Sequence, residues 1–215
     1  MNVPKVTIVD YGIGNLLSVR RGLEHCGAKV NVTGVPAQIK TAPKLVLPGV
    51  GAFGKAMLEL ERLSLTDAIR EVVRRQTPLL GICLGMQLLL DESSEFGQTA
   101  GFGFIPGRVI PIPTRTPSGE PLKIPHIGWS ELRLPNGART WHGTVLEDNQ
   151  EGEAVYFVHS FMAEPLDPTH RIANYAYGGH LVAAVIGRDN VTGCQFHPEK
   201  SGEVGLKVLR KFVSK

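Results

Sequence analysis

The sequence predicts an α/β protein with an open, mostly parallel mixed sheet and helices on both faces. Short apolar or β-branched runs alternate four times with helical segments in the first half of the chain. This alternation is typical of parallel βαβ units, in which each helix returns the chain to start the next strand. From about Gly101 the pattern changes to short strands separated by Pro and Gly, without long helices. These later strands predict antiparallel additions to the sheet and surface loops.

Length and composition predict one globular domain over residues 1–215. The chain is 42% hydrophobic and 20% charged, and 215 residues are enough to bury a full core. A net charge of +3 without any basic run gives no support for nucleic-acid binding. No apolar run approaches the ~18 residues of a membrane span, and the N-terminus lacks a signal-peptide pattern. The three irregularly spaced cysteines suggest neither a disulfide framework nor a metal site, and they suit a reducing, cytoplasmic location.

The individual elements follow from local patterns of apolar residues and turn signals. In the first half, strands are predicted at residues 6–10, 29–33, 44–47 and 78–82, with a helix at 16–25 and two helical segments before residue 78. Ser64 and Asp67 have the spacing of a capping box at the start of the second segment. In the second half, strands are predicted at 154–158, 171–175, 181–186 and 191–196, and a final helix at 202–213.

The most informative stretch is residues 78–91 (PLLGICLGMQLLLD), which predicts a buried strand, a sharp bend and a helix. Cys83 lies between Gly81 and Gly85 in the form G-x-C-x-G, the cysteine counterpart of a nucleophile elbow. A bend this tight favours glycine on both sides and pushes the central side chain out above the edge of the sheet. The positive end of a helix dipole favours a thiolate there. Cys83 is therefore predicted to be a nucleophile.

A cysteine nucleophile needs a base, and the base needs an acceptor that orients it. His197 ends a strand-like run and begins His197-Pro198-Glu199. In an extended backbone residues two apart point the same way, so Glu199 is expected to accept a hydrogen bond from one imidazole nitrogen while the other faces Cys83. The sequence therefore predicts a Cys-His-Glu triad.

The remaining cysteines and histidines are given structural or surface roles. Cys26 and Cys194 lie in apolar helical and strand patterns and are predicted to be structural. Surface positions are predicted for His25, His142, His170 and His180, while a structural role is favoured for His126 and His159. The early glycine loop does not bind a dinucleotide, because Leu17 replaces the third glycine, and no cofactor or metal is expected.

Three motifs together resemble the class I, triad-type glutamine amidotransferases: PGVG at 48–51, GICLGMQ at 81–87 and HPEKS at 197–201. They occur in the family's order and span nearly the whole chain. The resemblance implies the fold of that family in a single domain. It also implies that Cys83 attacks the side-chain amide of glutamine, releasing ammonia, and that water then hydrolyses the thioester to glutamate. His197 would move the protons and Glu199 would hold its tautomer.

The resemblance also implies the residues around the triad. The oxyanion would be met by backbone N–H groups of Leu84 and of either Val50 or Gly51. Glutamine contacts are expected from Gly49, Gln87, Glu95, Ser160 and Phe161. At Ala52 this sequence differs from some members of the family, which have a larger polar residue after PGVG.

Further motifs, DYGIGN at 10–15, PHIGW at 125–129 and YFVHSF at 156–161, resemble one branch of this family. Its members are separate glutaminase subunits that pass ammonia to a cyclase partner, a (β/α)8 barrel, in histidine biosynthesis. The resemblance implies a heterodimer in which Asn15, Trp129 and Lys200 face the cyclase subunit.

Three other functions are consistent with parts of the sequence. A paralogous glutaminase subunit could feed a different synthase, for example in sugar biosynthesis. A cysteine hydrolase could use the same elbow on another amide, although the HPE spacing and the PGVG turn argue against it. A regulatory or scaffold subunit would not need the full triad.

Overall fold

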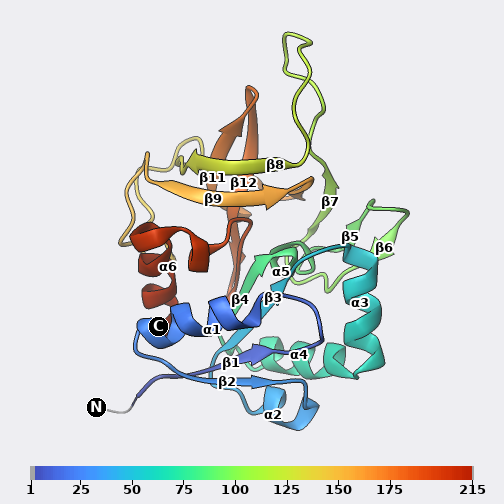
Figure 1. Cartoon of the computed structure of the whole chain (residues 1–215), viewed down its shortest axis with the longest axis vertical. Coiled ribbons are helices and arrows are strands. Elements are labelled where there is room, and N and C mark those ends of the chain that lie inside the picture. Colours follow the sequence, from blue (N-terminus) through green and yellow to red (C-terminus); the bar gives the residue numbers. More distant parts are fainter. Residues whose placement is uncertain (1–2, 215) are drawn as a thin grey trace.

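The computed structural model describes residues 3–214 and centres on a seven-stranded sheet (Figure 1). In spatial order its strands are β11 (Arg171–Tyr177), β12 (His180–Arg188), β13 (Val191–Cys194), β4 (Leu79–Cys83), β3 (Leu45–Gly49), β1 (Lys5–Val9) and β2 (Lys29–Thr33). The strands from β13 to β2 are parallel, whereas β12 and β11 are added in antiparallel pairs. The predicted mixed, mostly parallel sheet is confirmed.

Helices cover both faces of this sheet, as the sequence predicts. On one side are α1 (Leu16–His25) and α6 (Gly202–Ser214), and on the other are α2 (Pro36–Lys40), α3 (Phe53–Arg62) and α4 (Leu65–Arg74) (Figure 1). Successive strand residues point to opposite faces. In β1, Val6 and Ile8 therefore join the core with α1 and α6, while Val9 joins the core with α3 and α4. Among residues 3–214, no helix is long and apolar enough to cross a lipid bilayer.

The later strands only partly follow the prediction of additions to the main sheet. Two of them, β10 (Phe161–Pro165) and β7 (Gly107–Pro111), form a separate sheet with the short preceding strands β5 (Glu92–Ser93) and β6 (Thr99–Ala100), in the order β10-β7-β5-β6. Another two, β8 (His126–Glu131) and β9 (Ala154–His159), form an antiparallel ribbon above the end of the main sheet (Figure 1). Buried and partly exposed residues alternate in β9, which suits a ribbon with one packed face, whereas β3 and β4 are buried throughout.

Two local predictions are wrong. Ser64 precedes α4 in a left-handed conformation (φ 56°), and its side chain makes no capping hydrogen bond, because the chain must turn from α3 into α4 within two residues. The helix after the bend is predicted over residues 85–90 (GMQLLL), but α5 (Leu84–Gln87) has only four residues. It stops because the carbonyl groups of the next three leucines accept hydrogen bonds from the segment at residues 102–105 instead of continuing the helix.

The close approach of α5 to the sheet predicts which glycine the fold needs most. A Cβ at Gly85 would overlap the carbonyl oxygen of Leu47 in β3, and neither backbone can move without disturbing a buried strand. Gly85→Ala is therefore expected to lower the free energy of unfolding by about 3 kcal/mol or more. Denaturant unfolding measures this loss.

Gly54→Ala is the matched control, since Gly54 lies in helix α3 and a Cβ there would meet only the Thr99 side chain, whose hydroxyl is 3.2 Å away. Its effect is expected to stay within about 1 kcal/mol. A similar, small effect for both substitutions would contradict the close-packing account.

Candidate active site

The register of the parallel strands brings the three sequence motifs to one edge of the sheet. Gly49, at the end of β3, pairs with Cys83, and Ile82 pairs with Cys194 at the end of β13. The PGVG turn and the segment at 195–199 therefore lie on either side of Cys83. This is the carboxyl edge of the sheet, where open α/β folds place their ligands.

Cys83 occupies the strained bend that its glycine frame predicts. Its backbone has φ 55° and ψ −111°, an unusual conformation for a residue with a side chain. A Cβ at Gly81 would lie 2.6 Å from the carbonyl oxygen of Gly85, so the bend needs glycine there. The sulfur is 3.9 Å from the carbonyl oxygen of Val158 and 3.8 Å from the side-chain nitrogen of Gln195.

His197 and Glu199 form the expected hydrogen bond. The imidazole Nδ1 lies 2.8 Å from Glu199 Oε1, and because a carboxylate only accepts, Nδ1–H is the donor. The two side chains are only 4% and 1% exposed. The geometric reason differs from the prediction, because Glu199 lies in a 3-10 turn, η2 (Pro198–Lys200), and not in an extended strand.

The second imidazole nitrogen is free for chemistry. Nε2 of His197 is buried and has no hydrogen-bond partner among residues 3–214. Burial lowers the pKa of His197, but the neighbouring Cys83 sulfur and the Glu199 carboxylate outweigh it and raise the pKa to about 9. At neutral pH His197 is therefore mostly protonated, with its imidazolium beside Cys83.

A cavity of about 420 Å³ opens beside Cys83. Its walls are Gly51, Ala52, Cys83, Leu84, Gln87, Glu95, Phe96, Pro125, Val158, His159, Ser160 and Phe161. Most of the residues predicted to touch substrate are in this set. Gly49 and Val50 are not among the described residues that line the cavity. The Tyr11 hydroxyl occupies the space where a Gly49 side chain would lie, and Val50 is 42% exposed.

Gln87 and Glu95 hold fixed positions in the cavity wall. Gln87 is buried rather than on a helix surface, and its side-chain nitrogen donates to the carbonyl of Phe161 at 2.9 Å. The Glu95 carboxylate accepts from the backbone N–H of Phe53 at 2.6 Å. The part of the wall that contains Phe161 and Glu95 is therefore tied to both α5 and α3.

The three residues predicted to face a partner are all exposed at this end of the molecule. Asn15 accepts from the backbone N–H of Ser18 at the start of α1, and Lys200 lies in η2, which packs against α1. Trp129 in β8 is 56% exposed and lies edge-on to Tyr156 of β9, with ring centroids 5.9 Å apart.

Sequence reasoning missed two buried residues at the site. Tyr11 donates to the carbonyl of Pro48 at 2.8 Å, and burial and Cys83 raise its pKa. Gln195 is fully buried against the Cys83 sulfur. The strand predicted at 191–196 could have indicated it, because residues two apart in a strand point the same way and Gln195 lies two residues before His197; in the structure β13 ends at Cys194.

The other cysteines and histidines lie mostly as predicted. Cys194 is fully buried and Cys26 is half-buried, and burial raises the pKa of both thiols. His126 and His159 are buried among aromatic rings, which supports structural roles. The surface prediction is wrong for His170 and His180, which are half-buried; His180 donates to the carbonyl of Arg115.

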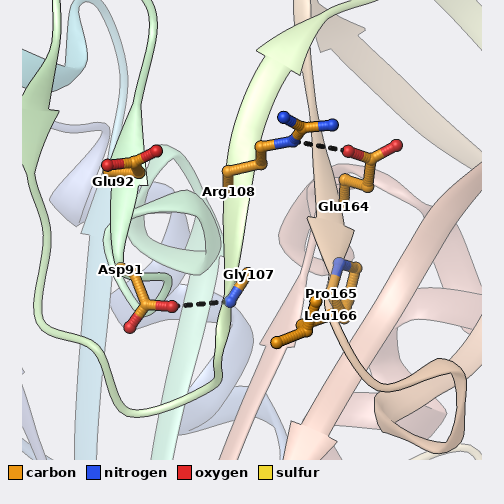
Figure 2. A pocket seen from close by; sticks show the side chains of 7 residues that line it. All are labelled: Asp91, Glu92, Gly107, Arg108, Glu164, Pro165 and Leu166. Carbon is orange, nitrogen blue, oxygen red and sulfur yellow. Dashed lines mark hydrogen bonds and ion pairs between the residues drawn. The ribbon is translucent and has the colours of Figure 1, made fainter.

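A larger cavity, of about 680 Å³, lies elsewhere, between the ends of β5, β7 and β10 (Figure 2). Its charges are already engaged: Arg108 pairs with Glu164 at 2.7 Å, and Asp91 accepts from the backbone N–H of Gly107 at 2.8 Å (Figure 2). The residues that line it include no cysteine, serine or histidine. The smaller cavity at Cys83 is therefore the candidate active site.

Comparisons with known proteins agree with this location. Residues 7–215 match the family model described as glutamine amidotransferase class-I. The chain is 48% identical over 208 residues to imidazole glycerol phosphate synthase subunit HisH 1 of Legionella pneumophila (strain Lens), covering 97% of this chain and 98% of that protein. It is 47% identical to the HisH subunit of Geobacillus thermodenitrificans (strain NG80-2), with 97% and 94% covered.

Solved structures with low sequence identity share the fold. The structure of PurLQS from Thermotoga maritima matches with a TM-score of 0.75 at 19% identity, covering 99% of each chain. The glutaminase domain of Trypanosoma brucei CTPS with bound acivicin matches with a TM-score of 0.64 at 13% identity, covering 100% of this chain and 95% of that one.

The raised pKa of His197 predicts a pH-dependent role for Glu199. Because the folded pKa is raised from 6.5 to about 9, the buried imidazolium stabilises the fold fully below about pH 6.5, and this contribution is lost as the pH rises through about 9. Glu199→Gln is expected to cost roughly 1–3 kcal/mol at about pH 6 and markedly less at about pH 10. Denaturant unfolding at the two pH values measures the difference.

Glu203→Gln serves as control, because Glu203 makes an exposed ion pair with Arg210 at 3.1 Å. Its small effect is expected to show no such pH dependence. An equal loss for Glu199→Gln at both pH values would contradict the assigned pKa.

Proposed function

The chain belongs to the class-I glutamine amidotransferases, and from this premise we propose that it is the glutaminase subunit of an imidazole glycerol phosphate synthase. In this role it hydrolyses glutamine to glutamate and ammonia in histidine biosynthesis. The names of relatives about half identical over nearly the whole chain support this assignment. The three unpaired cysteines suit work in the reducing cytoplasm.

One observation carries the chemistry: the buried His197–Glu199 pair beside a cysteine held at a nucleophile elbow. In the proposed reaction the Cys83 thiolate attacks the side-chain amide carbon of glutamine, forming a C–S bond and an oxyanion. His197 then protonates the departing nitrogen, so that ammonia leaves and a glutamyl thioester remains. Next, His197 removes a proton from water, which attacks the thioester; glutamate leaves and the thiolate returns. Glu199 keeps Nε2 directed at the reacting atoms.

The oxyanion needs backbone donors, and we assign them to Leu84 and to Val50 or Gly51. Leu84 begins α5 directly after the nucleophile, where the first N–H groups of a helix have no intrahelical partner. Gly51 lines the cavity with a backbone φ of 90°, while Val50 beside it is partly exposed.

The far wall of the cavity is proposed to hold the amino-acid end of glutamine. The Glu95 carboxylate is suited to the ammonium group, and the backbone of Ser160 and Phe161 offers further hydrogen bonds. Gln87 and Gly49 contribute mainly to the shape of the cavity. Gln87 already donates a hydrogen bond to Phe161, and Gly49 leaves room for the Tyr11 hydroxyl.

We propose that the ammonia passes to a cyclase subunit, a (β/α)8 barrel, that docks over the carboxyl edge of the sheet. Asn15, Trp129 and Lys200 are exposed around this edge and suit such a contact. The cyclase would then make imidazole glycerol phosphate and the aminoimidazole carboxamide ribonucleotide.

Replacement of Cys83 is expected to separate glutamine hydrolysis by this chain from synthesis by the cyclase subunit. In complex with the cyclase subunit, Cys83→Ser is expected to lower glutamine-dependent synthesis by roughly 10³-fold or more, since a hydroxyl cannot replace the thiolate. Synthesis from added ammonium salt is expected to continue, because that chemistry resides in the partner. Glutamate release and nucleotide product are measured for both nitrogen sources.

Cys26→Ser is the matched control and should retain both activities. Glutamine hydrolysis that survives in Cys83→Ser would refute the nucleophile. Cleavage of another amide without glutamate release would instead indicate a cysteine hydrolase, and failure to rescue a histidine auxotroph would indicate a paralogue that feeds a different synthase.

A further inference from the structure

A buried glutamine contacts the sulfur of Cys83. Gln195 is 0% exposed and directly follows β13, and its side-chain nitrogen lies 3.8 Å from the Cys83 sulfur. Its side-chain oxygen lies 3.0 Å from the side-chain nitrogen of Gln87. Gln195 therefore connects Cys83 to Gln87, which is itself hydrogen-bonded to Phe161 in the wall of the cavity.

The neighbouring hydrogen bonds fix which end of the Gln195 amide faces the sulfur. The carbonyl of Phe161 only accepts, so the Gln87 atom 2.9 Å away must be its NH₂ group. That same NH₂ group needs an acceptor on Gln195, which places the Gln195 oxygen toward Gln87. The Gln195 NH₂ group is left to donate to Cys83.

This network is anchored at its far end. Nδ1–H of His159 donates to the carbonyl of Phe161 at 2.8 Å, and the Tyr175 hydroxyl donates to Nε2 of His159, also at 2.8 Å. Burial is the main cause that lowers the pKa of His159, to about 4, so the ring is neutral with a single N–H. The Phe161 carbonyl is thus held in place by two donors.

We propose that Gln195 is a positioning residue whose side-chain amide donates a hydrogen bond to the Cys83 sulfur and so favours the thiolate. This inference rests on the proposed role of Cys83 as nucleophile. An N–H donor binds a negatively charged sulfur more strongly than a neutral thiol, so it shifts the acid–base equilibrium toward the charged form. The helix dipole adds less than the sequence suggests, since α5 has only four residues.

The amide acts together with two titratable groups that face the sulfur. His197 approaches from the end of β13, with Glu199 behind it, and Tyr11 approaches from the end of β1. His197 exchanges protons during the reaction, whereas the Gln195 amide does not titrate. Gln195 therefore supplies a stabilising contact that stays the same in every protonation state of the base.

This role is tested by measuring how the reactivity of Cys83, which depends on its thiolate form, changes with pH. Alkylation of Cys83 by iodoacetamide is followed from about pH 5 to about pH 9, with peptide mass mapping to separate the three cysteines. Gln195→Met, which keeps the size but removes the donor, is expected to raise the midpoint by about one pH unit, a roughly ten-fold lower rate below the midpoint. Gln195→Leu, which also removes the donor without adding a charge, is expected to raise it as well.

Cys194→Ala is the matched control, because Cys194 is the adjacent buried residue and belongs to the hydrophobic core. In this variant the alkylation midpoint of Cys83 is expected to stay unchanged. An unchanged midpoint in folded Gln195→Met would overturn the proposal; if that variant does not fold, Gln195→Leu decides by the same criterion. If Cys83 of the unaltered protein reacts only like an ordinary thiol, the proposed nucleophile itself fails.

Discussion

The site depends on one constraint, the tight packing of the bend at Cys83 against the neighbouring strand. A residue with a side chain at positive φ costs of order 1–3 kcal/mol, and such a conformation persists only where the surroundings enforce it. Here β4 is buried along its whole length, and α5 packs so closely on β3 that Gly85 leaves no space for a Cβ. The core therefore holds the strain that presents the sulfur at the edge of the sheet.

The electrostatics of the site follow from the burial of its charged groups. A buried imidazolium is unfavourable unless anions or hydrogen bonds compensate it. Glu199, only 1% exposed, supplies one negative partner, and a Cys83 thiolate supplies the other. Loss of either negative partner is therefore expected to lower the pKa of His197. The buried Gln195 amide adds a contact without adding charge.

The sequence predicts the parts of this protein that depend on local patterns. Helix α1 has the predicted bounds, and the glycine frame of Cys83 and the His197–Glu199 contact follow from short motifs. Other features depend on distant residues. The length of α5 is set by hydrogen bonds from residues 102–105, and Gln87 meets Phe161 across 74 positions. No local pattern contains such pairings, so the small sheets and the hydrogen bonds within the cavity wall could not be predicted. The residues of that wall are expected only from the resemblance to the family.

The two groups of elements have different tasks in the site. The main sheet, with its two cores, carries Cys83 at the end of the fully buried strand β4 and His197 in the segment that follows β13. Glu95 and Phe161 come instead from the small sheet and its loops, which close the cavity from the other side. Gln87 and Gln195 join the two parts through the bonds to Phe161 and Cys83. These bonds therefore connect the cavity wall that contains Phe161 to the strand that carries Cys83.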